Sequence, residues 1–356
     1  PCWLRRLVGK SPKPGVDIVG FLRSEIGLGE AARLMVAALD AGDIPAGLIT
    51  VPLPGRMAEP ALANRLATAS RHRTALAIFG AAEIGMFARR ACRDQTNIAY
   101  PYWELPRFPA AWRPWFERFD VYWAPTTFIR DALENVRSRP THLVPQPVDL
   151  PAEPRHQPFT GPLKFHTFFD ADSSIARKNP LGTIEAFRLA FPSGGEDARL
   201  LVKARGGCSD AARLSSLLAL ARQDARIEII DGTALMEDCN VFVSLHRSEG
   251  FGLGCAEALA RGKAVIATDF GGTRVFINEQ TGYPVQFAEA TVPPQDYFGT
   301  EGSYWAEPSL AHAASIMRAI YDDPGQTTAK AQAGFAHLKR HNSFDAVGRL
   351  IKERLG

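Results

Sequence analysis

Long apolar runs are missing from this sequence of 356 residues. None of its stretches approaches the roughly 18 consecutive apolar residues that a membrane-spanning helix needs. The first residues, PCWLRRLVGKSPKP, contain no apolar segment of the kind found in secretory signal peptides. The composition therefore argues against an integral membrane protein, and we expect no signal peptide.

Cysteine is scarce and irregularly spaced. The cysteines are Cys2, Cys92, Cys208, Cys239 and Cys255. They are odd in number and form no C-x-x-C or Cys/His pattern, which argues against a disulfide framework and against structural zinc. We therefore expect a cytoplasmic protein.

Charge is also limited, with a formal net charge of +3 at pH 7. Lys and Arg outnumber Asp and Glu only in the first 150 residues, which open with a basic segment, residues 1–15. A basic first half suits an anionic membrane surface or a phosphorylated acceptor, although so small an excess is also compatible with no such partner. We expect no nucleic-acid partner and leave open a peripheral contact with the inner face of the cell membrane.

What the sequence does contain is centred on residues 248–269, SEGFGLGCAEALARGKAVIATD. The apolar run just before it, residues 241–245, predicts a buried strand, and the segment itself predicts a glycine turn, a helix and a second buried strand. Glu249 stands in the turn and Glu257 two helical turns further on, about 12 Å along the axis, with the free N–H groups of the helix between them. A sugar nucleotide suits this layout, because it carries hydroxyls at both ends and phosphates in the middle. The alternative is that Glu249 caps the helix and Glu257 lies on a solvated face.

The spacing of Glu249 and Glu257 resembles the E-x7-E motif of the retaining glycosyltransferases of family 4. Other stretches are similar, in the same order, to a bacterial surface-polysaccharide branch of that family, which transfers mannosyl or glucosyl groups. These stretches are residues 21–39, 102–109, 121–150 and 177–191.

The resemblance implies an α/β protein of the GT-B fold. Two Rossmann-like α/β/α domains would face each other across a deep cleft, and a C-terminal helix would cross back to the first domain. The proline-rich segment VPQPVDLPAEPRHQPFTGP has the composition of an interdomain linker. We expect an acceptor-binding domain over residues 1–155, a donor-binding domain over residues 156–335 and a returning helix over residues 336–356.

The resemblance also assigns donor-binding residues in the second domain. Lys178 matches the family's phosphate-binding lysine, Glu249 would grip the sugar hydroxyls, and Glu257 would bind the ribose diol. Arg177 offers a second cation in place of a basic residue that relatives carry after the preceding strand; the alternative is a solvated charge at a helix end. Further donor contacts are expected from Lys203, Gly250, Phe251, Gly252 and Leu253, and contact with the base from residues 231–233.

A glycine turn in the first domain has two interpretations. Residues 27–32, GLGEAA, formally match the G-x-G-x-x-A form of the dinucleotide fingerprint. The second strand is not followed by the acidic residue that would hold an adenosine ribose. By resemblance, Gly29 faces the donor's phosphates, whereas the alternative is a purely structural turn. A dinucleotide oxidoreductase is the competing enzyme class.

Trp103 and Glu104 follow a predicted strand of the first domain, at the end where an open α/β sheet binds ligands. We expect Trp103 to stack on a sugar face of the acceptor and Glu104 to bind acceptor hydroxyls or take a proton. Many relatives carry a histidine in this region, and this sequence has none there. Downstream, residues 108–123 interleave aromatic and basic side chains, which favours core packing over an interfacial surface.

A metal site is not expected. Asp170 and Asp172 formally match the D-x-D motif of metal-dependent glycosyltransferases, but those enzymes have one Rossmann-like domain. Asp172, followed by two serines, is better explained as turn and capping chemistry.

These observations predict a metal-independent retaining hexosyltransferase without a cofactor. Its donor would be a nucleotide-diphosphate sugar, GDP-mannose first and a UDP sugar next, and its acceptor a glycan or lipid-linked oligosaccharide in surface polysaccharide synthesis. The catalytic residues would be Glu249, Lys178 and Glu104. The alternative is a non-catalytic subunit that binds a sugar nucleotide and supports another transferase.

Overall fold

The computed structural model describes residues 13–53, 62–67, 69, 71–154, 161–206, 211–230 and 239–356. The chain divides into two compact units. Unit 1 comprises Pro1–Asp149 and Arg340–Gly356, and unit 2 comprises Leu150–Lys339. These limits lie a few residues from the expected ones. Most of the basic first segment and the expected base-contacting residues 231–233 lie outside the described residues.

Unit 1 is built on a six-stranded sheet in the order β2-β1-β3-β4-β5-β6. Every neighbouring pair of strands is parallel. The strands are β1 (Lys13–Gly20), β2 (Ala46–Thr50), β3 (His72–Gly80), β4 (Thr96–Tyr102), β5 (Val121–Ala124) and β6 (Thr141–Leu143). Their apolar runs are buried on both faces, as expected for a parallel sheet covered by helices.

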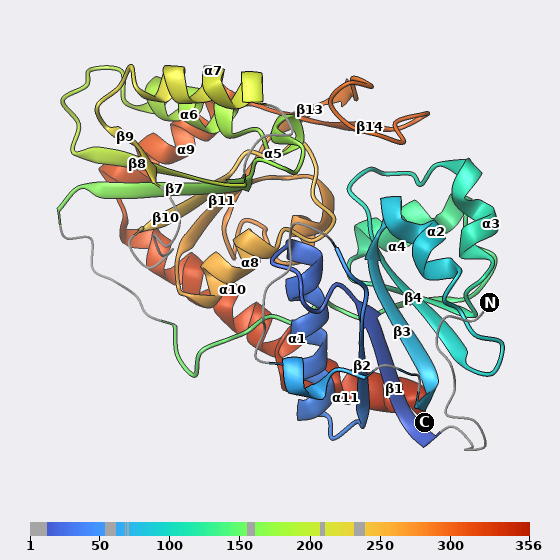
Figure 1. Cartoon of the computed structure of the whole chain (residues 1–356). Helices are drawn as coiled ribbons and strands as arrows, with labels where there is room; N and C mark the ends of the chain where they lie inside the picture. The colour runs from blue at the N-terminus through green and yellow to red at the C-terminus, as the bar shows by residue number, and fades with distance from the viewer. Residues whose placement is uncertain are drawn as a thin grey trace. The chain divides into compact units, whose positions relative to one another are not determined.

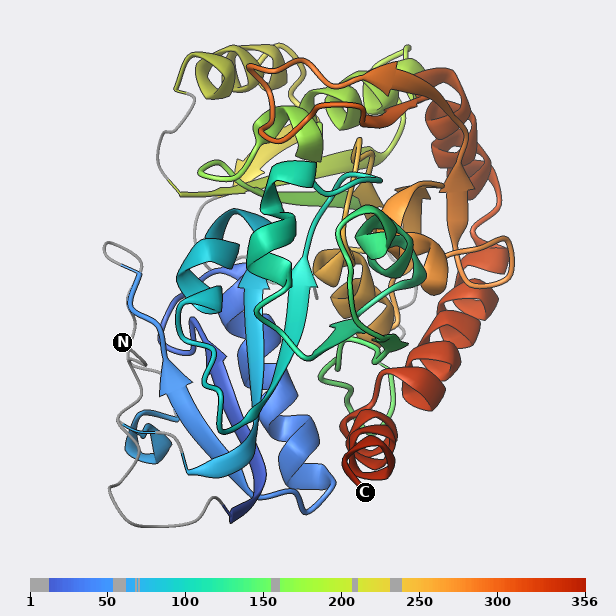
Figure 2. The ribbon, with the colours of Figure 1, turned by 90° about the vertical axis from the view of Figure 1, so that its right-hand side faces the viewer.

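Five α-helices accompany this sheet among the described residues. They are α1 (Gly27–Ala41), α2 (Ile84–Ala88), α3 (Arg113–Phe116), α4 (Thr127–Ala132) and α11 (Phe344–Leu355). The last of these, α11, packs beside α1 (Figure 1 and Figure 2). Gly42 and Gly348 allow this approach, because a Cβ atom on Gly348 would stand 2.4 Å from the carbonyl oxygen of Ala38. The end of the chain therefore belongs to unit 1, as the predicted returning helix requires.

Unit 2 repeats the plan with a second six-stranded parallel sheet, in the order β12-β11-β10-β7-β8-β9. Its strands are β7 (Leu163–Asp170), β8 (Ala198–Arg205), β9 (Ile227–Ile230), β10 (Val241–Ser244), β11 (Ala264–Thr268) and β12 (Tyr283–Val285). The described helices are α5 (Ile175–Lys178), α6 (Pro180–Ala190), α7 (Ala211–Ala221), α8 (Leu253–Ala260), α9 (Leu310–Asp322) and α10 (Gly325–His341).

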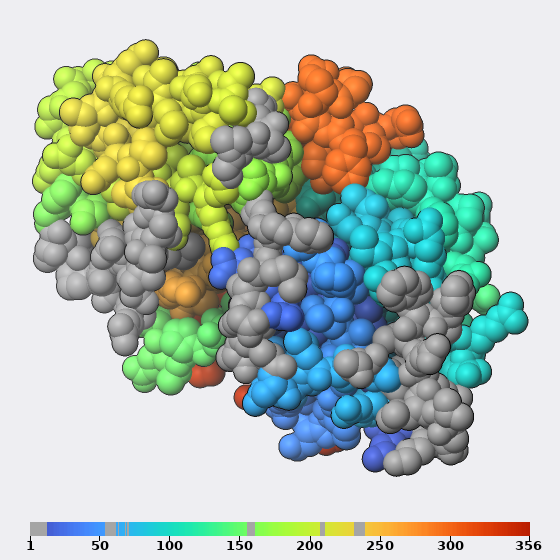
Figure 3. Space-filling view, viewed as in Figure 1, coloured from blue at the N-terminus to red at the C-terminus, as the bar shows by residue number. Residues whose placement is uncertain are grey.

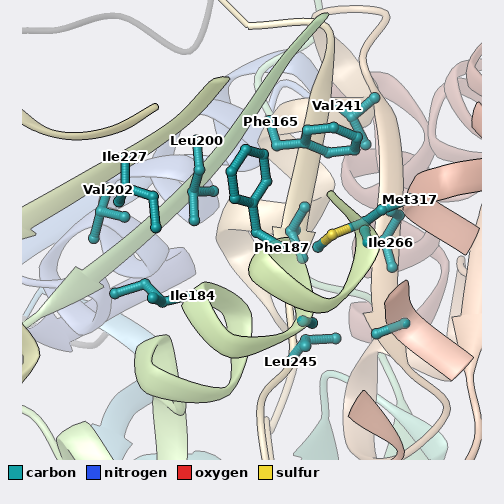
Figure 4. Close-up of a cluster of buried hydrophobic side chains, with 14 of the residues drawn as sticks. Phe165, Ile184, Phe187, Leu200, Val202, Ile227, Val241, Leu245, Ile266 and Met317 are labelled. Carbon is teal, nitrogen blue, oxygen red and sulfur yellow. The ribbon is translucent and has the colours of Figure 1, made fainter. Parts of the chain in front are cut away.

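The core of unit 2 lies between the sheet and helices α6 and α9 (Figure 4). Phe165 of β7 packs edge-on against Phe187 of α6, with ring centroids 6.1 Å apart. Both side chains are fully buried. Strands β7 and β10 are parallel neighbours, so the segments following them reach the same edge of the sheet.

A separate antiparallel hairpin stands apart from the unit 2 sheet. It consists of β13 (Phe287–Thr291) and β14 (Tyr304–Pro308). The hairpin is not evident from the sequence, because two prolines and a run of polar residues make this stretch resemble a loop.

The cysteines agree only in part with the expectation from the sequence. Cys239 and Cys255 are free and buried. Cys92 is disulfide-bonded, so the prediction against disulfides does not hold for this residue. No helix in the described part of the chain is both long and apolar enough to cross a membrane.

Candidate active site

The centre of the site is the turn that follows β10. Two glycine turns press against each other here, since the N–H of Gly272 donates to the carbonyl of Glu249 at 2.6 Å. Gly271 has a φ of +82°, and a Cβ atom at that position would stand 2.5 Å from the same carbonyl oxygen. A Cβ atom on Gly272 would lie 1.9 Å from the carbonyl oxygen of Gly250. Both glycines are therefore needed for the backbone of Glu249 to lie where it does.

Arg177 and Lys178 are the cations of the site, and both lie on α5, a helix of a single turn. Ser174 caps it by accepting a hydrogen bond from the N–H of Arg177 at 3.1 Å. Asn179 ends it in the left-handed conformation, with φ +51° and ψ +48°. The side chain of Asn179 then donates to the carbonyl of Leu245 at 2.9 Å, which ties α5 to the segment after β10. The local sequence thus delivers Arg177 and Lys178 to the glycine turn.

Glu249 forms an ion cluster with both cations. Lys178 Nζ donates to Oε1 of Glu249, and Nη1 of Arg177 lies 3.2 Å from the same oxygen. Arg177 also donates to the carbonyl of Ser248 at 2.8 Å. The side chains of Arg177 and Glu249 are 5% and 10% exposed, whereas that of Lys178 is 27% exposed. Lys178 is therefore the member of the cluster that solvent and a ligand reach most easily.

This cluster keeps Glu249 ionised. Burial by itself disfavours the charged form, but the charges of Lys178 and Arg177 outweigh burial and lower the pKa of Glu249 to about 2. Both cations contact Oε1, and no described residue donates to Oε2. The site therefore offers a carboxylate with one oxygen held and one oxygen able to accept from a hydroxyl.

His246 lies buried behind the cluster and is neutral. The carbonyl of Phe270 lies 3.0 Å from Nε2, and the hydroxyl of Ser244 lies 3.0 Å from Nδ1. Because a carbonyl can only accept, Nε2 carries the proton and Nδ1 accepts from Ser244. Burial lowers the pKa of His246. This histidine links the two glycine turns and adds no charge to the site.

Helix α8 begins directly after the turn, as the sequence predicts. Its first residue follows Gly252, which adopts a φ of +85°, a conformation that favours glycine. Glu257 lies half-buried within this helix. The N–H groups at the start of α8 and the two cations of α5 are the groups of this site that suit an anion.

Lys203 is carried by a strand, β8, rather than by α5 or the glycine turns. It sits near the end of β8, with Nζ 5.7 Å from the ring centroid of Phe168. Burial, with a smaller effect of the Lys203 charge, lowers the pKa of His166 to about 4. The role of Lys203 in phosphate binding stays a prediction.

The two aspartates of the D-x-D sequence make a turn. Oδ1 of Asp170 accepts from the N–H of Asp172 at 2.9 Å. Among the described residues, no group of three or more His, Cys, Asp or Glu side chains is placed to hold a metal ion.

In unit 1, the turn before α1 is held by internal contacts. A Cβ atom on Gly29 would stand 2.1 Å from the carbonyl oxygen of Ser24. Arg33 of α1 donates to the carbonyls of Leu22 and Ser24 at 3.1 and 3.0 Å. These contacts give Gly29 a structural reason to be glycine, as the alternative interpretation expects.

The prediction that Trp103 stacks on an acceptor sugar is wrong for this structure. Its side chain is fully buried, and its Nε1 donates to the carbonyl of Arg107 at 2.7 Å. It packs against Phe108 and Trp112 instead. The sequence could not show this, because an aromatic residue after a strand is equally suited to the core.

Glu104 is half-buried at the end of β4. Burial raises the pKa of the neighbouring Glu83, and the charge of Glu104 contributes to that shift. Unit 1 therefore carries a pair of interacting carboxylates where the sequence predicted acid–base or acceptor chemistry.

The aromatic stretch of residues 108–123 lies mostly in the core, as favoured. Phe108, Phe116 and Phe119 are buried. Trp115 lies at the surface beneath the guanidinium of Arg89, at 5.1 Å from its ring centroid. A pocket of about 330 Å³ opens here, lined by Ala88, Arg89, Pro114, Trp115 and Arg118.

Arg247 is the functional candidate that the sequence analysis missed. Its N–H donates to the carbonyl of Arg177 at 2.7 Å, and its guanidinium donates to the carbonyl of Ala176 at 2.6 Å. It therefore joins the turn of Glu249 to α5. Its position two residues before Glu249 was the available signal.

One family model matches part of the chain. Residues 176–291 match the family model described as glycosyl transferases group 1, and the matched region contains Lys178, Glu249 and Glu257. No curated protein matches the chain.

Solved structures resemble the whole chain. The structure of Anabaena HepE in complex with UDP and glucose has a TM-score of 0.70 at 13% identity, and covers 96% of this chain and 99% of that one. Sucrose-phosphate synthase from Thermosynechococcus elongatus has a TM-score of 0.68 at 15% identity, with coverage of 96% and 98%. The pneumococcal O-GlcNAc transferase GtfA, in complex with UDP and GlcNAc, has a TM-score of 0.58 at 14% identity, with coverage of 79% and 56%.

The two sheets of six parallel strands with flanking helices have the GT-B fold, as predicted. Within that fold, residues 176–291 match the model of a glycosyl transferases group 1 domain. Fold and domain together support a GT-B glycosyltransferase.

Proposed function

We propose that this protein is a retaining hexosyltransferase that uses a nucleotide-diphosphate sugar. The observation that carries the proposal is the cluster of Glu249 with Arg177 and Lys178 beside the start of α8. It combines a sugar-binding carboxylate with a phosphate-binding set of donors on one edge of a parallel sheet. Ligands bind at this edge in open α/β sheets.

The diphosphate would be held by Lys178, Arg177 and the N–H groups at the start of α8. These groups stabilise the negative charge that develops on the leaving phosphate when the glycosidic bond breaks. Lys178 is the more exposed cation, so it can turn from Glu249 to the arriving phosphate. Arg177 is held by Ser248 and stays in place.

Glu249 would orient the sugar, and Glu257 the ribose. The Oε2 atom of Glu249 accepts from sugar hydroxyls while Oε1 remains paired with Arg177. A carboxylate held by two cations is a poor nucleophile, which disfavours a covalent glycosyl intermediate on Glu249. We therefore infer attack on the same face of the sugar, with the leaving phosphate receiving the acceptor's proton and no metal required.

Donor and acceptor identity are the finer parts of the proposal. GDP-mannose is the first candidate from the resemblance to polysaccharide enzymes, and UDP sugars are the second, since neighbouring structures hold UDP. The acceptor is a glycan or a lipid-linked oligosaccharide in surface polysaccharide synthesis. Glu104 is the candidate that binds the acceptor or takes its proton.

A panel of GDP and UDP sugars tests the donor by thermal shift. A ligand at a hundred times its dissociation constant adds about 2.7 kcal/mol of stability. Transfer assays with the stabilising donor then separate an enzyme from a donor-binding subunit. Donor binding without any transfer would favour the subunit, and the absence of binding by every sugar nucleotide would refute the proposal.

The subunit alternative has one observation in its favour. Phe169, which stands where relatives carry a basic residue, is buried in the core and cannot contact a phosphate. Arg177 compensates for the missing basic residue, because its guanidinium reaches Glu249 and supplies the second cation. Loss of nucleotide-diphosphate binding in the Arg177→Gln variant would support the idea that Arg177 replaces the basic residue of the relatives.

Peripheral contact with an anionic membrane is a further part of the proposal. The pocket of Arg89, Trp115 and Arg118 combines two cations with an aromatic ring, which suits an interfacial phosphate. Flotation with vesicles of anionic and of neutral lipid tests this contact. We expect binding only to the anionic vesicles, weakened in the double variant Arg89→Ala/Arg118→Ala; equal flotation with both lipids would contradict it.

A further inference from the structure

The loop and the second strand of the β13–β14 hairpin lie beyond the part of the chain that the family match covers. The match ends at residue 291, the last residue of β13. The connecting loop, residues 292–303, and strand β14 follow it. The hairpin is marked in Figure 1, and its residues form the protruding orange surface in Figure 3. The contacts of the hairpin described below help to hold α5 in place.

At its base, the hairpin is tied to α5 through Arg247. Two nitrogens of Arg247 donate to the carboxylate of Glu307 on β14, at 2.6 and 2.9 Å. The same guanidinium donates to the carbonyl of Ala176 in α5. The N–H of Ala306 donates to the carbonyl of Arg247 at 2.8 Å. One arginine therefore connects β14, the turn of Glu249 and the helix that carries Arg177.

At its tip, the loop completes the cap of α5. The hydroxyl of Ser174 donates to the carbonyl of Asp296 at 2.8 Å while it accepts from the N–H of Arg177. The carboxylate of Asp296 pairs with Arg213 of α7 at 2.7 Å. The ring of Tyr297 lies 5.8 Å from the guanidinium carbon of Arg177. The tip thus contacts the start of α5 and the cation itself.

The flank of the hairpin packs on the second glycine turn. Phe270 contacts Phe287 of β13 and Tyr304 of β14, with ring centroids 5.3 and 5.9 Å apart. Phe270 immediately precedes the glycines that press on Glu249. The hairpin therefore touches both halves of the ion cluster.

These contacts matter because α5 cannot hold itself. A helix of four residues has almost no intrinsic stability in water, since nucleation fixes several dihedral angles for a single hydrogen bond. Its position has to come from tertiary contacts. The hairpin provides them directly at Ser174 and, through Arg247, at the carbonyl of Ala176.

We propose that the β13–β14 hairpin is a positioning element for the diphosphate-binding cations. Glu307, acting through Arg247, and the loop of Asp296 and Tyr297, acting through Ser174 and Arg177, fix α5 so that Arg177 and Lys178 meet the diphosphate without movement of the helix backbone. This inference rests on the proposed function of the site.

The first test shortens the loop. Thr291 and Tyr304 are directly paired in the hairpin, so replacing residues 292–303 by Asn-Gly closes it with a two-residue turn. Calorimetry compares UDP and GDP with UMP and GMP. We expect the affinity for the diphosphate that the wild type binds to fall about tenfold, as expected for a weakened charge-assisted contact, with the affinity for the monophosphate nearly unchanged.

The second test removes the base contact with Glu307→Ala, and Glu307→Gln keeps the shape without the charge. In the alanine variant we expect the same selective loss of diphosphate affinity and a raised KM for the donor. In the glutamine variant we expect partial recovery of the diphosphate affinity. Asp322→Ala is the matched control, because Asp322 pairs with Arg318 at similar exposure and away from α5. This variant should leave the affinities for the diphosphate and the monophosphate, and also KM and kcat, unchanged.

The outcomes separate the two proposals. If the wild type binds UDP or GDP and the hairpin variants keep its preference for the diphosphate, the positioning role is refuted and the proposed function stands. Equal loss of mono- and diphosphate affinity would also refute it, because that pattern means general damage to the unit. If the wild type binds neither diphosphate, both proposals fail.

Discussion

Two buried carboxylates, one in each unit, show how differently the chain uses the same chemical group. Asp17 lies inside β1 and is fully buried. It contacts His72 Nδ1 at 2.7 Å and accepts from the N–H of Arg71, the N–H of His72 and the amide of Gln95 at 2.9 to 3.1 Å. Glu249 lies in a turn after β10 and is held by two cations on a single oxygen.

The difference separates a structural carboxylate from a functional one. Both oxygens of Asp17 are used by groups of β3 and its neighbours, and a Cβ atom on Gly47 would stand 2.2 Å from one of them. No room for a ligand is left there. Glu249 keeps Oε2 for a ligand and has a partner, Lys178, that is partly exposed. The free oxygen and the accessible cation mark the binding site.

The largest effect is expected from Asp17→Ala. It would leave the buried donors of His72 and Gln95 without their acceptor and lower the free energy of unfolding by about 3–5 kcal/mol. Urea unfolding measures this. Asp40→Ala is the control, because Asp40 pairs with Arg65 at the surface and should cost less than about 1 kcal/mol. Equal losses in the two variants would contradict a structural role for Asp17.

Acid should weaken the Glu249 cluster. The pKa of Glu249 is lowered to about 2, so its contribution to stability is present above the unfolded pKa of about 4.5 and is lost as the pH falls towards 2. The shift corresponds to about 3 kcal/mol. The difference in unfolding free energy between wild type and Glu249→Gln, measured from pH 7 to pH 3, should shrink as the pH falls. A difference independent of pH would show that Glu249 is not held as a carboxylate.

Lys178→Ala should reduce glycosyl transfer at least about a hundredfold, because a donor aimed at the leaving phosphate is lost. Its melting temperature should stay near that of the wild type, since Lys178 is partly exposed and Arg177 still pairs with Glu249. Glu249→Ala is a poorer probe, because it leaves the buried Arg177 without its carboxylate and lowers stability as well. Transfer that survives Lys178→Ala would overturn the site assignment.

The smallest loss of stability is expected from replacing glycines that have a positive φ, of which two are compared. Gly271→Ala forces a Cβ atom to 2.5 Å from the carbonyl oxygen of Glu249, so we expect a loss above about 2 kcal/mol together with weaker donor binding. Gly302→Ala meets nothing within 4 Å and should cost only about 1 kcal/mol of backbone strain. Urea unfolding and calorimetry with UDP and GDP measure both. Similar losses would mean that the contact of the two glycine turns is unimportant.

Much of the site could be predicted because its signals are local. The apolar run of residues 241–245 folds as expected into β10, and the glycines and helix-forming residues of the segment 248–269 into the turn, α8 and β11. The pairing of Lys178 with Glu249 was within reach only through a family resemblance, since the two residues are 71 positions apart. Trp103 was mispredicted because burial depends on neighbours that a strand-end position does not reveal.

The sequence by itself determined the alternation of strands and helices and the turn that carries Glu249, because periodicity, glycine and capping residues act over a few positions. Only the tertiary structure decided the partners of each charge. Arg247 meets Glu307 60 positions away, and Ser174 meets Asp296 122 positions away. Such contacts depend on which strands are neighbours and on how a short, intrinsically unstable helix is held between them.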